Sequence, residues 1–285
     1  MKLRLLCAGV FGIVALVSAS VSAQWPLHPA AGAPRTSSGR VRLDAPTPRT
    51  PDGKPDLSGL WQTVQSGSGQ VIVGAEVPPL LRTSQFWNIG AGLDDDLPLQ
   101  PWAYELRNKR IADHSKDNPD AHCLPIGLTQ LHNHPQPRKM IQTPSVLLIL
   151  YEANGGIRQI FTDGRPLPAN DPQPWWYGYS IGKWEGDTLV VETRNFNPRS
   201  AYRNANAATL RLVERFTRTA PDRIEWAVTV DDSMTWTRPW TFVMPLTLNE
   251  SEPVLEFACH EGNYAIRNIL SAARSAERGE AVKKP

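Results

Sequence analysis

Apolar and polar residues alternate along most of the chain beyond residue 140, the period-two pattern typical of strands with one buried face. Turn residues separate the alternating stretches, for example Asn154-Gly155-Gly156 between the first two. The predicted strands are IQTPSVLLILYEA, IRQIF, YGYSIGKW, TLVVETRNF, ATLRLVERFTR, RIEWAVTV, TWTRPWTFVMPL and PVLEFAC. Successive strands with short turns predict a mainly β fold, an antiparallel meander that closes as a barrel or folds into a sandwich.

Two segments favour helices instead. Residues 101–115 (PWAYELRNKRIADHS) contain helix formers throughout, with Pro101 suited to an early helical position. Residues 262–280 (GNYAIRNILSAARSAERGE) predict an amphipathic C-terminal helix that runs into a charged tail. We therefore expect a short helix before the sheet and a second helix after it.

The chain is expected to form one domain because strand signals continue without a linker. Residues 24–55 are dense in Pro, Gly, Ser and Arg, which predicts a flexible or extended leader. The β-barrel-like domain is then placed at residues 56–270, and the charged tail at residues 271–285.

The first 23 residues have the form of a secretory signal peptide. Lys2 and Arg4 precede an apolar stretch, and Val21-Ser22-Ala23 supplies small residues for cleavage. No later run approaches the roughly 20 apolar residues that a membrane helix needs. The sequence therefore predicts a periplasmic or secreted protein with no integral membrane segment after signal cleavage.

Two cysteines follow the signal peptide, Cys123 and Cys259. In an oxidising compartment, an even pair without C-x-x-C spacing predicts a disulfide. A bridge closing so long a loop contributes roughly 4–5 kcal/mol in the chain-entropy model.

Charge and aromatic content narrow the class of partner. The formal net charge of +2 gives no basic surface for nucleic acid, so no nucleic-acid partner is expected. Ten tryptophans are consistent either with core packing or with a stacking surface for a ring-bearing ligand. The sequence has no phosphate-binding glycine loop and no dinucleotide-binding pattern, so no cofactor is predicted.

The stretch Gly178–Gly182 (GYSIG) matches G-x-S-x-G, the pattern that carries the nucleophilic serine of many hydrolases. That motif requires a strand, a sharp turn at the serine and then a helix. Here KWEGDTLVVET follows, which predicts a hairpin. We therefore interpret Ser180 as a strand residue and not as a nucleophile.

The longer run GYSIGKWEGDTLVVET, together with IRQIFTDGRPLP, LRLVERFTR and TWTRPWT, resembles a group of uncharacterised secreted bacterial proteins that share a G-x-S-x-G-x-W-E-G-D-T-L-V-V core. The resemblance covers residues 56–265, including HCLPIG and FACHEGNY. It implies secretion and a lipocalin- or calycin-like barrel, and it implies no particular activity. Members often carry H-P-H-S/T-E before the L-x-x-x-E-R-F strand. This chain has YRNANAATL there, so no histidine chemistry carries over.

Two charged residues fall on apolar strand faces. Alternation places Glu214 between Leu212 and Phe216, and Arg238 between Trp236 and Trp240. Charges on such faces are expensive to bury unless they are paired, so a Glu214–Arg238 ion pair is one interpretation. The other is a polar cluster inside a barrel that orients a ligand or performs acid–base chemistry.

Histidines gather ahead of the sheet. His132 and His134 share one face of an extended segment, a spacing compatible with a weak metal site, although the prolines that follow favour a loop. His122 and His260 each adjoin a cysteine of the predicted disulfide and would approach each other with it. No metal site is otherwise predicted.

Two functional hypotheses follow. The first is a barrel that binds a small, partly apolar or ring-bearing molecule through the aromatic residues Tyr179, Trp184, Trp236 and Trp240. The second is a cofactor-free or metal-assisted lyase, isomerase or hydrolase that uses Glu214, Arg238 and His134 as acid–base groups. The turn residues Asp163, Arg165, Glu185 and Asp187 are explained equally well by turn chemistry and by function.

Overall fold

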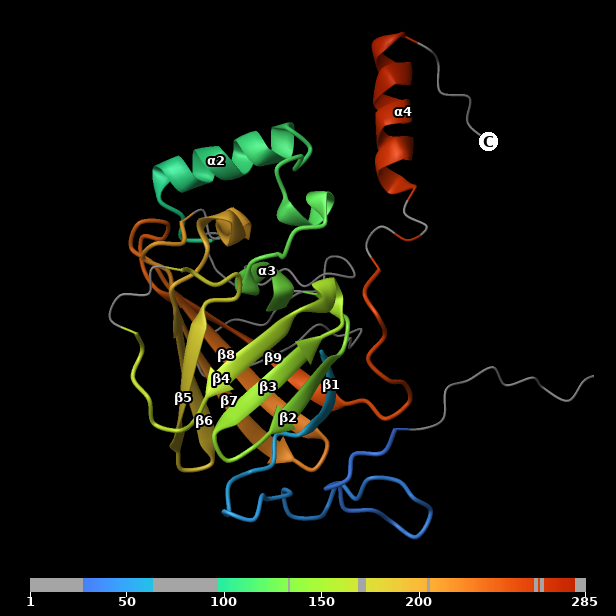
Figure 1. The fold of residues 1–285 in the computed structure, drawn as a ribbon, viewed down its shortest axis with the longest axis vertical. Coiled ribbons are helices and arrows are strands. Elements are labelled where there is room, and N and C mark those ends of the chain that lie inside the picture. The colour runs from blue at the N-terminus through green and yellow to red at the C-terminus, as the bar shows by residue number, and fades with distance from the viewer. Residues whose placement is uncertain are drawn as a thin grey trace, which may run out of the picture.

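The computed structural model describes residues 28–63, 97–132, 134–168, 173–203, 206–258, 261 and 264–279. Nine strands form one closed barrel in chain order (Figure 1). They are β1 (Gly59–Thr63), β2 (Arg138–Gln142), β3 (Val146–Tyr151), β4 (Ile157–Phe161), β5 (Tyr179–Glu185), β6 (Thr188–Arg194), β7 (Arg211–Ala220), β8 (Arg223–Asp231) and β9 (Trp240–Leu248). The mainly β fold expected from the alternating pattern is confirmed, and of the two closures that the pattern allowed, the structure has the lipocalin-like barrel that the resemblance implied.

The strand pairing departs from a simple meander at one place. Every neighbouring pair is antiparallel except β4 and β5, which run in parallel with Ile160 opposite Ser180. The long connection between them returns the chain to the end of the barrel where β4 began. A Cβ at Gly182 would lie 3.1 Å from Ile160 Cγ2, so the glycine allows β5 to approach β4 closely. The prediction of an all-antiparallel order is therefore wrong at this pair.

The last predicted strand is also wrong over its described part, because residues 253–258 adopt no regular structure. β1 already pairs with β9, with Trp61 opposite Leu248, and this contact closes the barrel. No free edge is left in the closed sheet for another strand to join.

Both predicted helices are present, as α2 (Pro101–Ala112) and α4 (Ala265–Glu277). The short helix α3 (Leu128–His132) and three 3-10 turns were not expected from the sequence. The turns are η1 (Pro119–His122), η2 (Ala153–Gly155) and η3 (Pro198–Arg203). Within the described ranges, no helix has the length and apolar character to span a bilayer.

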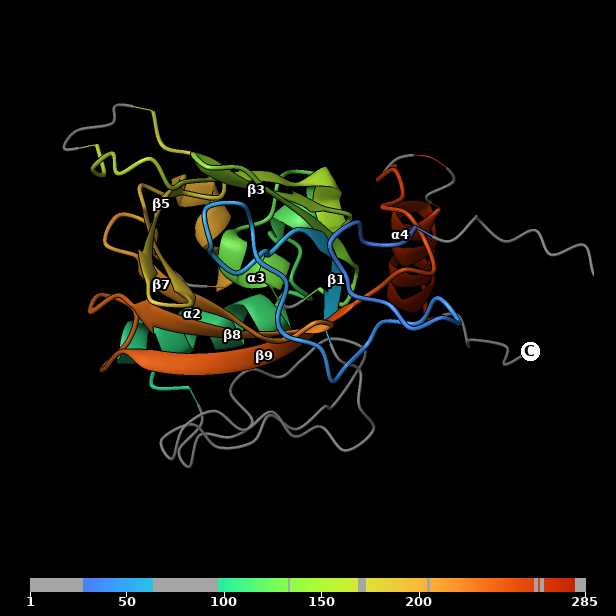
Figure 2. The same cartoon turned by 90° about the horizontal axis from the view of Figure 1, so that it is seen from below.

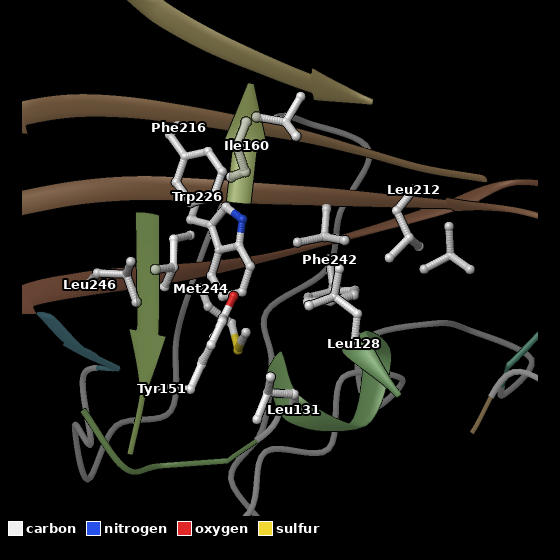
Figure 3. Close-up of a cluster of buried hydrophobic side chains, with 14 of the residues drawn as sticks. Leu128, Leu131, Tyr151, Ile160, Leu212, Phe216, Trp226, Phe242, Met244 and Leu246 are labelled. Atoms are coloured by element: carbon white, nitrogen blue, oxygen red, sulfur yellow. The ribbon is translucent and has the colours of Figure 1, made fainter. Parts of the chain in front are cut away.

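Helices α2 and α3 occupy one end of the barrel, which we call the α3 end. Figures 1 and 2 show α2 lying across this end and α3 beneath it, and every residue of α3 is buried. Figure 3 shows Leu128 and Leu131 of α3 among barrel side chains such as Trp226. Burial of such side chains contributes about 1.5–3 kcal/mol each, so α3 is held as part of the core.

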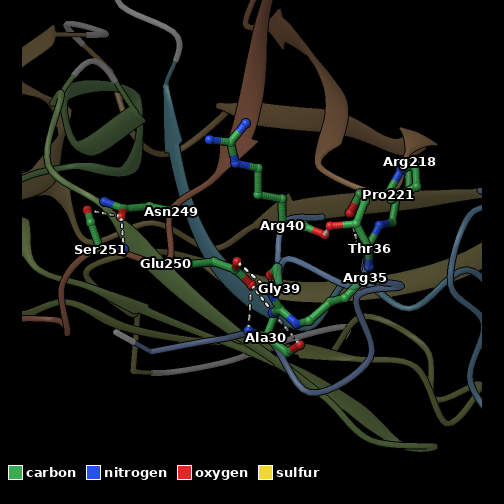
Figure 4. Close-up of polar contacts among 10 residues, drawn as sticks. All are labelled: Ala30, Arg35, Thr36, Gly39, Arg40, Arg218, Pro221, Asn249, Glu250 and Ser251. Atoms are coloured by element: carbon green, nitrogen blue, oxygen red, sulfur yellow. Dashed lines mark hydrogen bonds and ion pairs between the residues drawn. The ribbon is translucent and has the colours of Figure 1, made fainter. Parts of the chain in front are cut away.

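The opposite end, which we call the leader end, is covered by residues 28–58 (Figure 1). Arg35 pairs with Glu250 at 2.6 Å, and the backbone N–H of Ala30 donates to the same carboxylate (Figure 4). The Arg218 guanidinium donates to backbone carbonyls, including those of Asp56 and Pro221. The leader segment is thus joined to the barrel through polar contacts.

Candidate functional site

A group of polar side chains is enclosed inside the barrel near the α3 end, and we call it the interior cluster. Its members come from α3 and from six different strands, β2 to β7, that meet around the barrel axis. They are His132, Arg138, Tyr151, Arg158, Ser180, Thr193 and Glu214, and each is at least 95% buried. Polar groups buried to this extent require partners, so the pairing within the cluster decides its chemistry.

The centre of the cluster is the ion pair between Arg158 and Glu214. Arg158 Nη1 donates to Glu214 Oε1 at 3.0 Å, and Nη2 donates to Oε2. Trp226 Nε1 donates to Oε1 at 3.2 Å. Burial lowers the pKa of Arg158, but the charge and hydrogen bonds of Glu214, together with the interactions of Tyr151, outweigh burial, and the pKa is raised. The Glu214 carboxylate is therefore committed to Arg158.

The expected ion pair between Glu214 and Arg238 is wrong. Alternation correctly placed Glu214 on the inner face, since the residue is fully buried. Strand β9 begins only at Trp240, however, so the period-two pattern does not extend back to Arg238. Arg238 lies in an exposed bend between Trp236 and the start of the strand. Arg158 provides the buried guanidinium instead.

Ser180 accepts hydrogen bonds from Arg158 as well. It lies within β5 and is fully buried, and β5 continues into a hairpin with β6, so the strand–turn–helix geometry of a nucleophile is absent. Arg158 Nε donates to Ser180 Oγ at 3.2 Å, and the Thr193 hydroxyl lies 2.9 Å from Ser180 Oγ. The interpretation of Ser180 as a strand residue is confirmed.

His132 ends α3 inside the barrel. Its Nε2 lies 3.2 Å from Glu214 Oε1 without a well-aligned hydrogen bond, and its ring meets the Trp226 ring edge-on at 4.2 Å between centroids. Burial, followed by the charges of Arg138 and Arg158, holds the pKa of His132 well below its ordinary value. The imidazole is therefore neutral near pH 7.

Arg138 and Tyr151 complete the cluster and are opposite each other in the β2–β3 pair. Arg138 Nη2 donates to the carbonyl oxygen of His134 at 3.2 Å, and the guanidinium lies over the Trp226 ring at 5.2 Å. Burial raises the pKa of the Tyr151 hydroxyl, although Arg158 and Arg138 act in the opposite direction. Tyr151 is therefore a neutral phenol.

A cleft opens at the α3 end, between α2 and the loop that joins β8 to β9. It encloses about 180 Å³, and we call it the α2 cleft. Its lining is mostly apolar with two guanidinium groups: Leu97, Leu99, Ala103, Arg107, Arg110, Ile111, Ser115, Tyr202 and Trp236. Arg110 donates to the Tyr202 carbonyl oxygen at 2.5 Å and lies over its ring at 4.5 Å, so this wall is held in place.

The predicted ligand-binding aromatics do not form one surface. Trp236 lines the α2 cleft and packs edge-on against Trp240 at 5.0 Å. Tyr179 lies on the outer face beside Trp175, with 5.1 Å between ring centroids. Trp184 lies below the Lys54 ammonium, which is 5.9 Å from its ring, toward the leader end. Only Trp236 and Trp240 are brought together.

The remaining predicted residues are distributed over the surface or lie outside the described residues. Asp187 pairs with Arg49, Glu185 with Arg215 at 3.2 Å, and Asp163 with Arg165 at 2.5 Å. These contacts agree with turn and surface chemistry. His134 is half-buried, and its backbone carbonyl oxygen accepts a hydrogen bond from Arg138. Among the residues that the structure describes, no three His, Cys, Asp or Glu side chains form a metal-binding group.

Residues 1–23, Cys259 and His260 lie outside the described ranges, so the signal peptide and the disulfide with Cys123 stay predictions. Comparisons with family models, with curated proteins and with solved structures found no match to this chain. The assignment of a function therefore depends on the geometry of the interior cluster and of the α2 cleft.

Proposed function

We propose that this protein is an exported barrel that binds a small, partly apolar or ring-bearing molecule in the α2 cleft. The observation that carries the proposal is the cleft itself, whose walls are apolar over Leu97, Leu99 and Ala103 and aromatic at Trp236. Ligand sites are usually concave and apolar with a few polar groups that fix orientation. Arg107 and Arg110 give the wall positive charge, which favours a ligand with a negatively charged group.

The volume supports a small ligand. About 180 Å³ accommodates a single ring or a short aliphatic chain, and it is too small for a large lipid. A neighbouring hollow of about 270 Å³ shares Arg110 and Tyr202, but Asp117, His122 and Arg199 make its lining polar. The α2 cleft is therefore the better match to a partly apolar molecule.

The test is to fill the cleft. Native mass spectrometry of protein purified from its natural host identifies a bound molecule, and benzoate and hexanoate serve as initial probes in calorimetric titrations. Leu97→Trp places an indole in the cleft and should weaken binding at least tenfold. Leu43→Trp is the matched control, because Leu43 is 64% exposed near the leader end and should bind like the wild type. Equal affinity in wild type and Leu97→Trp would disprove the site.

The alternative is an enzyme that uses His132 and Glu214 as acid–base groups. The 3.2 Å approach of the neutral His132 ring to the Glu214 carboxylate, with Tyr151 nearby, favours this hypothesis. The enclosure of all three side chains opposes it, since a substrate would have to displace α3 to reach them. Turnover of the bound molecule by wild type and its loss in His132→Gln would decide for the enzyme.

A further inference from the structure

We infer that the interior cluster contains a second binding site, for a small monoanion held by Arg138. The inference does not depend on the α2 cleft or on its ligand.

The enclosed charges do not balance. Arg138 and Arg158 each carry a positive charge, because a guanidinium stays protonated in proteins. Glu214 is the single carboxylate of the cluster, and both of its oxygens accept hydrogen bonds from Arg158. His132 and Tyr151 are neutral near pH 7 for the reasons given above. The cluster therefore carries one excess positive charge away from water.

The excess charge is located at Arg138. Its Nη2 donates to the carbonyl oxygen of His134, but Nε and Nη1 have no acceptor among the described residues, although the side chain is 1% exposed. An uncompensated buried charge is strongly unfavourable, and an ionised group bound against it removes most of that penalty. A monoanion supplies both the missing acceptor and the missing charge.

One further group lies close to Arg138. The Arg138 guanidinium lies over the Tyr151 ring at 5.6 Å, and the Tyr151 hydroxyl, which interacts with Arg158, forms no well-aligned hydrogen bond. A neutral phenol is a donor and can bind an anion. The single proton of the neutral His132 ring belongs on Nε2, which faces Glu214 Oε1 at 3.2 Å, so Nδ1 is an acceptor and does not contribute. The site thus combines one cation with a neutral donor.

A matched arginine shows that the fold can satisfy such a group when no ligand is involved. Arg218 is also buried and lies over a tryptophan, Trp61, at 5.1 Å. Its Nε, Nη1 and Nη2 donate to the carbonyl oxygens of Ala220, Asp56 and Pro221. Arg138 has the same ring contact without this set of acceptors, which points to an external acceptor.

The anion must be small. Arg138 is 1% exposed, its guanidinium lies over the Trp226 ring, and the barrel interior is filled by a continuous apolar core. This enclosure favours a halide or a formate-sized carboxylate over a larger acid. Chloride, bromide and formate are therefore the probes, with gluconate as an anion too bulky to enter.

The test compares thermal unfolding in sodium salts of these anions at constant ionic strength. For the wild type we expect the melting temperature to rise by about 5 °C or more from gluconate to saturating chloride, bromide or formate. Arg138→Met should lose the rise and melt no lower than wild type in gluconate, because it removes the unbalanced charge. Tyr151→Phe should reduce the rise. Arg218→Met should melt lower in every salt and keep the rise.

A bromide-soaked crystal of the wild type provides a second, independent measurement. We expect an anomalous peak within hydrogen-bond distance of an Arg138 nitrogen. A rise of equal size in Arg138→Met, a rise seen only at molar salt, or water alone beside Arg138 in the crystal would overturn the site. A large loss of stability for Arg138→Met in gluconate would instead assign Arg138 a structural role.

Discussion

The leader end and the α3 end both bury an arginine against a tryptophan ring, but only the leader end surrounds its arginine with acceptors. Arg218 donates to three backbone carbonyls, whereas Arg138 donates to one. The other buried polar atoms without partners in the described chain follow the same division. They include atoms of Thr63, His132, Tyr151, Thr235 and Trp240, all located toward the α3 end.

This division agrees with the two sites proposed above. Buried polar groups in a folded protein are normally satisfied, so a set of unsatisfied groups at one end supports the proposal that ligands bind there. The α2 cleft opens at that same end. The leader end is closed by contacts such as Arg35–Glu250 and Arg218–Asp56. The comparison therefore favours the α3 end for the proposed ligand sites, whereas the contacts at the leader end stabilise the barrel.

The largest effect is expected from breaking the central ion pair. Arg158→Met leaves Glu214 buried without its cation and should lower the free energy of unfolding by roughly 3–5 kcal/mol, measured by urea denaturation. The matched change at the leader end is Arg218→Met. It leaves only neutral carbonyl oxygens without a donor and should lower the free energy of unfolding by about 1–3 kcal/mol. The double variant Arg158→Met/Glu214→Gln should lose less free energy of unfolding than the two single variants lose together. Additive effects would mean that the two side chains act independently.

A smaller effect is expected where α3 packs against η3. A Cβ added at Gly127 would lie 1.9 Å from the carbonyl oxygen of Ser200, so Gly127→Ala must displace backbone. We expect a loss of about 1–3 kcal/mol and faster hydrogen exchange in α3.

Gly32→Ala is the control for this change at the leader end. Its Cβ would meet only a carboxylate oxygen of Asp56, at 3.0 Å, and this side chain can move away. Equal stability of the Gly127→Ala protein and the Gly32→Ala protein would show that α3 is not tightly seated.

The smallest effect concerns pH. Because the pKa of His132 is well below 6.5 in the folded protein, the unfolded chain binds a proton that the native state does not bind between that lowered pKa and pH 6.5. Stability is therefore fully present above about pH 6.5 and falls on acidification, by up to about 1.4 kcal/mol per pH unit. Urea midpoints from pH 7.5 to 5.5 should show this slope in wild type and a shallower one in His132→Gln. Parallel slopes would contradict a buried neutral histidine.

Alternation in the sequence predicted the strands of a barrel or a sandwich and placed Glu214 on the buried face, because a strand with one buried face has a strict period of two. The same rule could also have identified the partner of Glu214, which the sequence analysis missed. In IRQIF, Arg158 alternates with Ile157 and so shares the inner face with Ile160, and both residues are buried. Arg238 was misplaced because the pattern was extended beyond the true start of β9.

Two parts of the site could not be found from local patterns. Helix α3 has five residues, too few for a helical period to be recognised, so the burial of His132 had no signal. The α2 cleft brings Leu97, Tyr202 and Trp236 together from segments far apart in the chain. Such proximity arises from tertiary packing and leaves no trace in any short window of sequence.

The contact between the first and last strands determines when this fold can form. Because Trp61 pairs with Leu248, the ring of strands stays open until β9 has been synthesised. Until then β1 and β8 each have an unpaired edge, the feature through which incomplete β proteins aggregate. So distant a closing contact also gives the chain a high contact order, which is associated with slow folding. A chain that ends before β9 would retain most of its residues and still lack a barrel.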